Sequence, residues 1–121
     1  MILLDTNAVI WIERRHRRAR PLARRTGLAV SPATILELQF LAEAGRIRLR
    51  GRGLQDIIDD ERWVVDEPPS MDWFRGAAEE SWTRDPFDRL IVAHARLRRF
   101  TLATADGALL ERLRPTERLE L

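Results

Sequence analysis

The chain has 121 residues, of which 45% are hydrophobic, so it is long enough for one domain with its own core, and we expect a single domain over residues 1–121. It has no cysteine, which excludes disulfides and cysteine-ligated zinc, and all 21 basic residues are arginine, which excludes P-loop and Schiff-base lysine chemistry. The formal net charge is only +2 at pH 7, yet seven arginines crowd into residues 14–25.

Short apolar runs alternate with helical patterns along the whole chain. Pro21 interrupts the arginine-rich stretch, whereas serine and proline at 31 and 32 are typical of a helix start and Gly45 of a helix end. In chain order the pattern predicts a strand over residues 1–4, a helix over 8–12, a solvated loop with a short helix over 14–25, a strand over 28–30, a helix over 31–44, a short helix over 53–60, a strand over 62–65, helices over 68–81 and 85–97, a strand over 101–104, a helix from 106 and a closing strand over 118–121.

This alternation predicts an α/β fold with a mostly parallel central sheet of four to five strands, flanked by helices. In such sheets, ligands bind beyond the carboxyl ends of the strands. The apolar runs are too short to cross a membrane and the N-terminus lacks a basic leader, so we expect a soluble cytoplasmic protein.

Four acidic residues are placed to meet at the carboxyl edge of this sheet. Asp5 and Asp106 each follow a predicted strand, and Asp88 lies in the first turn of the helix over 85–97. Glu37 lies in an otherwise apolar helical run, so we expect it to be partly buried. Asp5, Asp85 and Asp106 also stand at helix starts, where aspartate is favoured as an N-cap for its hydrogen bonds alone.

Capping does not account for the group as a whole. Three or four carboxylates at one edge repel one another, and the chain has no lysine to neutralise them. A divalent cation would resolve that repulsion. Magnesium takes oxygen ligands, usually one or two carboxylates with water, and leaves room for a phosphate.

Four blocks of sequence together resemble the PIN domain, and specifically the VapC-type toxins of type II toxin–antitoxin systems. The resemblance covers essentially the whole chain, and only the region 46–81 matches poorly. The blocks occur in the order and at the spacing of that family: Ile2-Leu3-Leu4-Asp5-Thr6-Asn7, Ser31-Pro32-Ala33-Thr34-Ile35-Leu36-Glu37-Leu38, Arg84-Asp85-Pro86-Phe87-Asp88-Arg89-Leu90-Ile91-Val92-Ala93-His94-Ala95 and Leu102-Ala103-Thr104-Ala105-Asp106.

The resemblance implies a three-layer PIN-like domain that hydrolyses RNA as a metal-dependent endoribonuclease. The family's four acids correspond, in order, to Asp5, Glu37, Asp88 and Asp106. They would hold Mg²⁺ or Mn²⁺, which acidifies a bound water so that it can attack the phosphodiester. Thr104, Asp85 and Asn7 are expected to be accessory, and the role of Asp85 stays open.

The resemblance also implies partners: an RNA substrate, a small antitoxin encoded beside the toxin, and a second copy of the chain in a homodimer. Two alternatives stay open. The first is a catalytically weak PIN fold that only binds RNA or protein, although all four acids are present. The second is a receiver-like or phosphatase-like domain, which the missing lysine disfavours.

The arginine-rich stretch has two interpretations. Arg14, Arg15, Arg17 and Arg18 could contact RNA phosphates without reading sequence, or simply form a solvated surface. The tryptophans at 11, 63, 73 and 82 are expected to be core or interface residues rather than platforms for bases. His94 is expected to be structural, because no serine–histidine arrangement accompanies it.

Overall fold

The computed structural model describes all residues from 1 to 121. The expected strands and helices are all present, with bounds that differ by a few residues at most. The elements are β1 (Ile2–Leu4), α1 (Thr6–Glu13), the 3₁₀ helix η1 (Arg17–Leu22), β2 (Leu28–Val30), α2 (Pro32–Glu43), α3 (Leu54–Ile58), β3 (Val64–Val65), α4 (Ser70–Glu79), α5 (Pro86–Arg98), β4 (Thr101–Thr104), α6 (Gly107–Arg112), the 3₁₀ helix η2 (Pro115–Glu117) and β5 (Arg118–Glu120).

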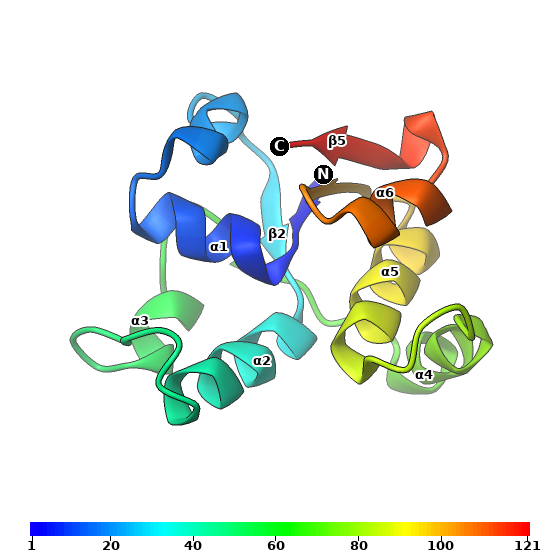
Figure 1. Ribbon diagram of the computed structural model, residues 1–121, viewed down its shortest axis with the longest axis horizontal. Coiled ribbons are helices and arrows are strands. Elements are labelled where there is room, and N and C mark those ends of the chain that lie inside the picture. Colours follow the sequence, from blue (N-terminus) through cyan, green and yellow to red (C-terminus); the bar gives the residue numbers. More distant parts are fainter.

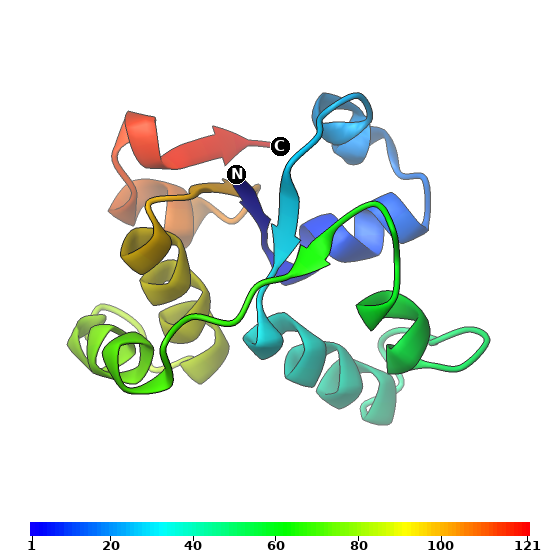
Figure 2. The ribbon, with the colours of Figure 1, turned by 180° about the vertical axis from the view of Figure 1, so that it is seen from behind.

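The five strands form one sheet in the order β3-β2-β1-β4-β5, and every pairing is parallel. The expected sheet was mostly parallel with four to five strands, and the structure confirms it. The first strand is central, with β2 and β4 on either side of it. Figures 1 and 2 show α1, η1 and α3 on one side of this sheet and α4, α5 and α6 on the other, so the fold has three layers.

Successive side chains along the short strands pack into two hydrophobic cores, one on each face of the sheet. On β1, Leu3 belongs to the core beneath α4 and α5, whereas Leu4 belongs to the core beneath α1 and α2. The neighbouring strand β4 divides Leu102 and Ala103 between the same two cores. Because successive side chains on a strand point to opposite faces, a strand of three residues serves both layers.

Two local expectations need correction. The strand expected over 62–65 is only two residues long, Val64–Val65. Trp63, directly before it, buries its ring in the core and donates its indole N–H to the carbonyl of Ile57. Pro21 does not interrupt the arginine-rich segment, but lies inside η1. A 3₁₀ helix bonds each N–H only three residues back, and the bonds that start at Ala19 and Ala23 bypass the proline nitrogen.

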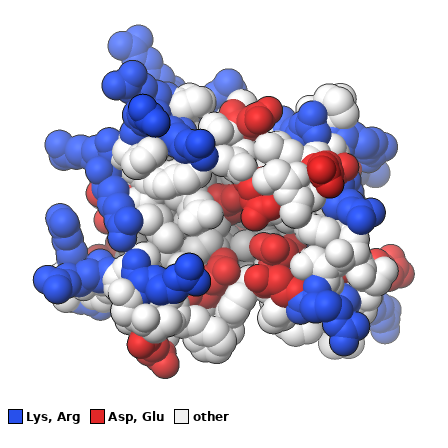
Figure 3. All heavy atoms as spheres, in the orientation of Figure 1, with Lys and Arg blue, Asp and Glu red and all other residues white.

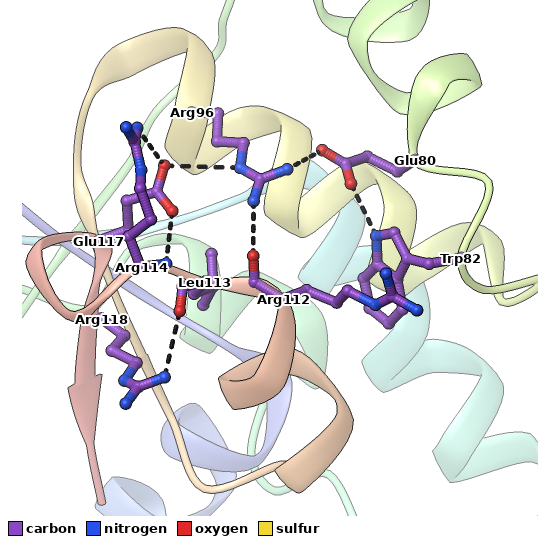
Figure 4. A network of polar contacts seen from close by, with 8 residues as sticks. All are labelled: Glu80, Trp82, Arg96, Arg112, Leu113, Arg114, Glu117 and Arg118. Carbon is purple, nitrogen blue, oxygen red and sulfur yellow. Dashed lines mark hydrogen bonds and ion pairs between the residues drawn. The ribbon is translucent and has the colours of Figure 1, made fainter.

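A network of polar contacts anchors the C-terminal third of the chain (Figure 4). The Arg96 guanidinium of α5 lies 2.6 Å from a Glu80 carboxylate oxygen, 2.9 Å from the carbonyl of Arg112 and 3.6 Å from Glu117. The other Glu80 oxygen accepts the Trp82 indole N–H at 2.7 Å. These contacts hold α5 and α6 together, and the N-termini of these two helices carry Asp88 and Asp106. None of the helices has the length and apolar character needed to cross a bilayer.

Candidate active site

A cleft of about 390 Å³ lies at the carboxyl edge of the sheet, bordered by α1, α2, α5 and α6. Strands β1 and β4 are neighbours, so the residues that follow them open onto the same edge. Acidic atoms gather in this hollow in the space-filling view (Figure 3). All four predicted catalytic acids line it, together with Asp85: the acidic residues are Asp5, Glu37, Asp85, Asp88 and Asp106.

Asp5 is the most enclosed of the five, with 5% of its surface exposed. It follows β1 and caps α1, accepting the backbone N–H of Ala8 at 2.8 Å. Burial raises the pKa of Asp5 to about 6, and the charges of Asp106 and Glu37 add to that rise. Hydrogen bonds from Thr104 and Ala8 oppose it. The cap interpretation and the clustering of acids are therefore both correct for this residue.

Glu37 reaches the cleft from α2 and is half-buried, as its apolar neighbours predicted. The hydroxyl of Thr6 donates a hydrogen bond to its carboxylate, and the hydroxyls of Thr6 and Thr34 lie 3.3 Å apart. Burial raises the pKa of Glu37, as does the charge of Asp85, whereas the hydrogen bond from Thr6 lowers it. The supporting role of Thr6 was missed in the sequence, although it stands directly beside Asp5.

Asp85 and Asp88 share the start of α5 but differ in their contacts. The side chain of Asp85 accepts the N–H groups of Phe87 and Asp88 at 2.8 and 3.2 Å, which confirms it as the N-cap. Asp88 makes no such cap and faces the other acids. Its partial burial, followed by the charges of Asp85, Asp106, Glu37 and Asp5, raises the pKa of Asp88 to about 7. Asp88 is the acid whose ionisation the cleft disfavours most.

Asp106 follows β4 and caps α6 through Oδ1, which accepts the N–H groups of Ala108 and Leu109. Its Oδ2 makes no hydrogen bond within the chain and its side chain is exposed. The hydroxyl of Thr104 is fully buried and accepts the N–H of Asp106 at 3.1 Å. The same hydroxyl lowers the pKa of Asp5, so Thr104 acts on two of the acids, where an accessory residue was expected.

The structure separates the four arginines named as candidate RNA contacts. Arg14 lines the acidic cleft beside Asn7, the third accessory residue. Arg18 lies against Trp11, its guanidinium 5.4 Å from the ring centroid. Arg15 and Arg17 are exposed but do not line the cleft, and Arg15 borders a different hollow beside η1. A further arginine, Arg46, lines the cleft from the loop after α2, in the region where the sequence matched the family least.

His94 is fully buried, and its Nε2 lies 2.7 Å from a carboxylate oxygen of Asp66. Its Nδ1 is the one buried side-chain polar atom without a hydrogen-bond partner. Burial lowers the pKa of His94 despite the charge of Asp66. The residue does not line the acidic cleft and is a core position, as the sequence indicated.

The acids do not form a closed ligand cage. No three or more of the chain's histidine, aspartate and glutamate side chains are grouped so that they could hold a metal ion by themselves. All the side chains that converge are nevertheless oxygen donors, the type that Mg²⁺ and Mn²⁺ prefer. Burial, and after it the charges of the neighbouring acids, raises the pKa values of Asp5 and Asp88, and a bound cation would favour their ionised forms. The donor set fits an ion that takes one or two carboxylates and completes its shell with water.

The metal-free protein is expected to lose stability as the pH rises from about 4 to about 6, because of Asp5. The unfolded carboxyl ionises near its ordinary pKa of 3.8 and the folded one only at about 6, so between these values the folded state alone keeps the proton. A tenfold change in proton affinity is worth about 1.4 kcal/mol. The penalty at neutral pH is therefore on the order of 3 kcal/mol.

Melting curves in EDTA across this pH range, compared with those of Asp5→Asn, measure the effect. The variant keeps a capping oxygen but cannot ionise, so its curve should be flatter and lie higher at neutral pH. Because the lowered pKa of His94 acts in the opposite direction below about 6.5, the difference between the two proteins is the relevant quantity. Parallel curves would contradict the prediction.

Comparisons with known proteins place the chain in a family. The sequence matches the PIN domain over residues 2–114. No curated protein matches the chain at a significant level. Among solved structures, the chain is similar to a toxin–antitoxin complex from Klebsiella pneumoniae, with a TM-score of 0.71 and 17% identity over 100% of both chains.

Two further structures share the fold. VapBC2 from Rickettsia felis, bound to a DNA fragment from its promoter, has a TM-score of 0.66 and 22% identity, over 99% of this chain and 98% of that one. VapC20 from Mycobacterium tuberculosis, described as a sarcin–ricin loop cleaving toxin, has a TM-score of 0.67 and 16% identity, over 95% of this chain and 100% of that one. At these identities the likeness concerns the fold.

Proposed function

The chain belongs to the PIN domain family, and we propose that it is a metal-dependent endoribonuclease that acts as the toxin of a toxin–antitoxin pair. The observation that carries the proposal is the convergence of Asp5, Glu37, Asp88 and Asp106 on one cleft at the carboxyl edge of a PIN-type sheet. The similar fold of VapC20, described as cleaving the sarcin–ricin loop, supports RNA as the substrate class.

Each residue of the cleft has a distinct task in this proposal. Asp5 and Asp88 would hold Mg²⁺ or Mn²⁺, with Glu37 and Asp106 as supporting ligands. When bound, such an ion acidifies water for attack on phosphorus and offsets the charge of the phosphate. Thr6 keeps Glu37 oriented through its hydrogen bond, and Thr104 supports the turn that carries Asp106 by accepting the N–H of that residue. Asn7 is accessory at the rim, and Arg14 and Arg46 offer positive charge to the RNA backbone.

An RNA cleavage assay separates this proposal from the alternative of a PIN fold that only binds. The purified protein is incubated with a pool of cellular RNA and Mg²⁺ or Mn²⁺, and the RNA ends are sequenced. New ends at defined positions support the endoribonuclease and name the bond that is cut. Retention of RNA without any new ends would instead favour the binding module.

Replacing Arg14, Arg15, Arg17 and Arg18 by serine is expected to weaken RNA binding and flatten its salt dependence. Removing one arginine from a phosphate lowers the slope of log affinity against log salt by about 0.7 on single strands. Since Arg14 lines the cleft and Arg15 does not, Arg14→Ser alone should account for more of the change than Arg15→Ser. The slope is measured by titrating RNA at several salt concentrations.

A matched control is Arg75→Ser on α4, which removes an exposed arginine that makes no ion pair and does not border the cleft. Its salt slope should equal that of the parent. If the salt slope of the fourfold variant equals that of the parent, these arginines form a solvated surface and do not contact RNA phosphates.

We also propose two protein partners, a small antitoxin and a second copy of the chain. Apolar side chains stand exposed on α2 and α4, with Phe40 and Phe74 each 54% exposed, which suits burial against protein. The similarity to toxin–antitoxin complexes supports the first partner. The molecular mass in solution, measured alone and with the small protein encoded beside it, tests both.

A further inference from the structure

Trp11 is the only one of the four tryptophans that has no place in the core. The indole N–H groups of Trp63, Trp73 and Trp82 each donate a hydrogen bond to a carbonyl or carboxylate oxygen. These three rings also belong to the two core clusters or pack against them. The N–H of Trp11 donates no hydrogen bond within the chain, and its ring packs against neither cluster. Packing in the hydrophobic core does not explain a tryptophan here.

The position of Trp11 beside the acidic cleft accounts better for a tryptophan at this site. The side chain lines the acidic cleft, on the face of α1 that also carries Asn7 and Arg14. Residues spaced by three and four positions share one face of a helix, so these three form a strip that leads away from the acids. Trp11 lies six residues beyond Asp5, about 9 Å along the helix axis. In Figure 3 arginine side chains rise around this side of the acidic hollow, over η1 and the loop after α2.

The ring already stacks on planar groups. The imidazole of His16 lies 5.5 Å from it, centroid to centroid, at an interplanar angle of 23°. The guanidinium of Arg18 lies 5.4 Å from the ring centroid, and it makes no hydrogen bond or ion pair. Both of these side chains are exposed. Another planar group can therefore displace the Arg18 guanidinium from the ring without breaking a hydrogen bond or an ion pair. The positive charge of Arg18 would then remain beside Asn7, Trp11 and Arg14.

We propose that Trp11 is a stacking platform for an unpaired RNA base next to the bond that is cleaved, with Arg14 and Arg18 on the adjoining phosphates. The inference rests on the proposed ribonuclease function and adds a residue that positions its substrate: an unpaired base beside the cleaved bond would lie on the Trp11 ring. A base that is paired within a duplex has its faces covered by its neighbours, whereas an unstacked base can lie on an aromatic ring. A charged path with an aromatic platform is the arrangement by which proteins hold single strands.

The test compares Trp11→Leu and Trp11→Phe with the parent on a single-stranded RNA that the parent cleaves. A base–aromatic stack contributes enough affinity that its loss weakens binding roughly fivefold to a hundredfold. Trp11→Leu should therefore raise KM at least about fivefold with kcat little changed, because a flanking stack contributes equally to ground and transition states. Trp11→Phe, which keeps an aromatic face, should recover most of the loss.

A matched control is Leu97→Ala, which removes an exposed apolar side chain near the end of α5 that does not line the cleft; its KM should stay at the parent value. The second measurement uses Asp88→Asn protein, so that the RNA stays uncut. A 2-aminopurine placed beside the cleavage position should lose fluorescence on binding, and should keep it when Trp11→Leu is added.

The outcomes separate the two levels of the proposal. If the parent does not cleave RNA under any metal condition, the proposed function fails. If the parent cleaves, but Trp11→Leu keeps its KM and still quenches 2-aminopurine, the stacking platform is overturned while the nuclease stands. Equal cleavage of a fully paired duplex and a single strand would also overturn it.

Discussion

Replacing Asp88 by asparagine is expected to lower the rate of RNA cleavage by more than about 100-fold while the protein stays folded. Loss of an outer-shell partner of a metal already costs about 10- to 100-fold in affinity or activity, and Asp88 is assigned a direct ligand role. Burial, followed by the charges of the other acids, raises the pKa of Asp88 to about 7, and the cost of ionising this residue disappears in the asparagine variant. The melting temperature of the metal-free variant should therefore equal or exceed that of the parent at neutral pH.

The matched control is Asp85→Asn, three residues earlier on the same helix start. Asparagine caps a helix about as well as aspartate, and the Asp85 side chain acts as the cap through two backbone N–H groups. This variant should keep both its fold and its activity. Asp85→Ala should lose roughly 1 kcal/mol of stability with the cap and little cleavage.

Cleavage rates and melting curves of the three variants decide the assignment. Loss of activity in Asp85→Asn with Asp88→Asn still active would reverse the two roles. Comparable loss in both would make Asp85 a fifth member of the site. Its charge already contributes to the raised pKa values of Asp88 and Glu37, so the structure allows this outcome on electrostatic grounds.

Removing divalent metal is the second change with a large expected effect. RNA cleavage should vanish in EDTA and return when Mg²⁺ or Mn²⁺ is added in excess, because in the proposed reaction the bound ion supplies the activated water that attacks phosphorus. The same addition should raise the melting temperature, since a ligand that binds only the folded state stabilises it, by about 2.7 kcal/mol at a hundredfold excess over Kd.

The melting shift with Mn²⁺ should shrink in Asp5→Asn, which keeps its cap on α1 but loses the charge. This readout does not depend on finding the right RNA. If RNA is fully cleaved in EDTA and the Asp5→Asn variant is also active, the protein is not a metal-dependent nuclease. An equal melting shift in parent and variant would place the ion elsewhere.

Much of the fold could be predicted because local signals determine it. Ser31-Pro32 and Asp85-Pro86 start helices through the side-chain caps seen in the structure. Gly45, at a φ of +72°, ends the segment after α2 as a glycine readily does. Strands that alternate with helices imply parallel pairing, and the acids that directly follow strands then point to one edge. These features depend on residues close together in the chain.

What only the tertiary structure decided depends on residues far apart in the chain. The order β3-β2-β1-β4-β5 places Asp5 beside Asp106 by making β1 and β4 neighbours. The hydrogen bond from Thr6 to Glu37 spans 31 positions, and Arg46 enters the cleft from a region without a recognisable motif. The four tryptophans look alike in the sequence, yet packing buries or hydrogen-bonds three of them and leaves Trp11 at the acidic cleft. Caps and periodicity act within one or two turns of chain, whereas these contacts exist only once the layers have packed.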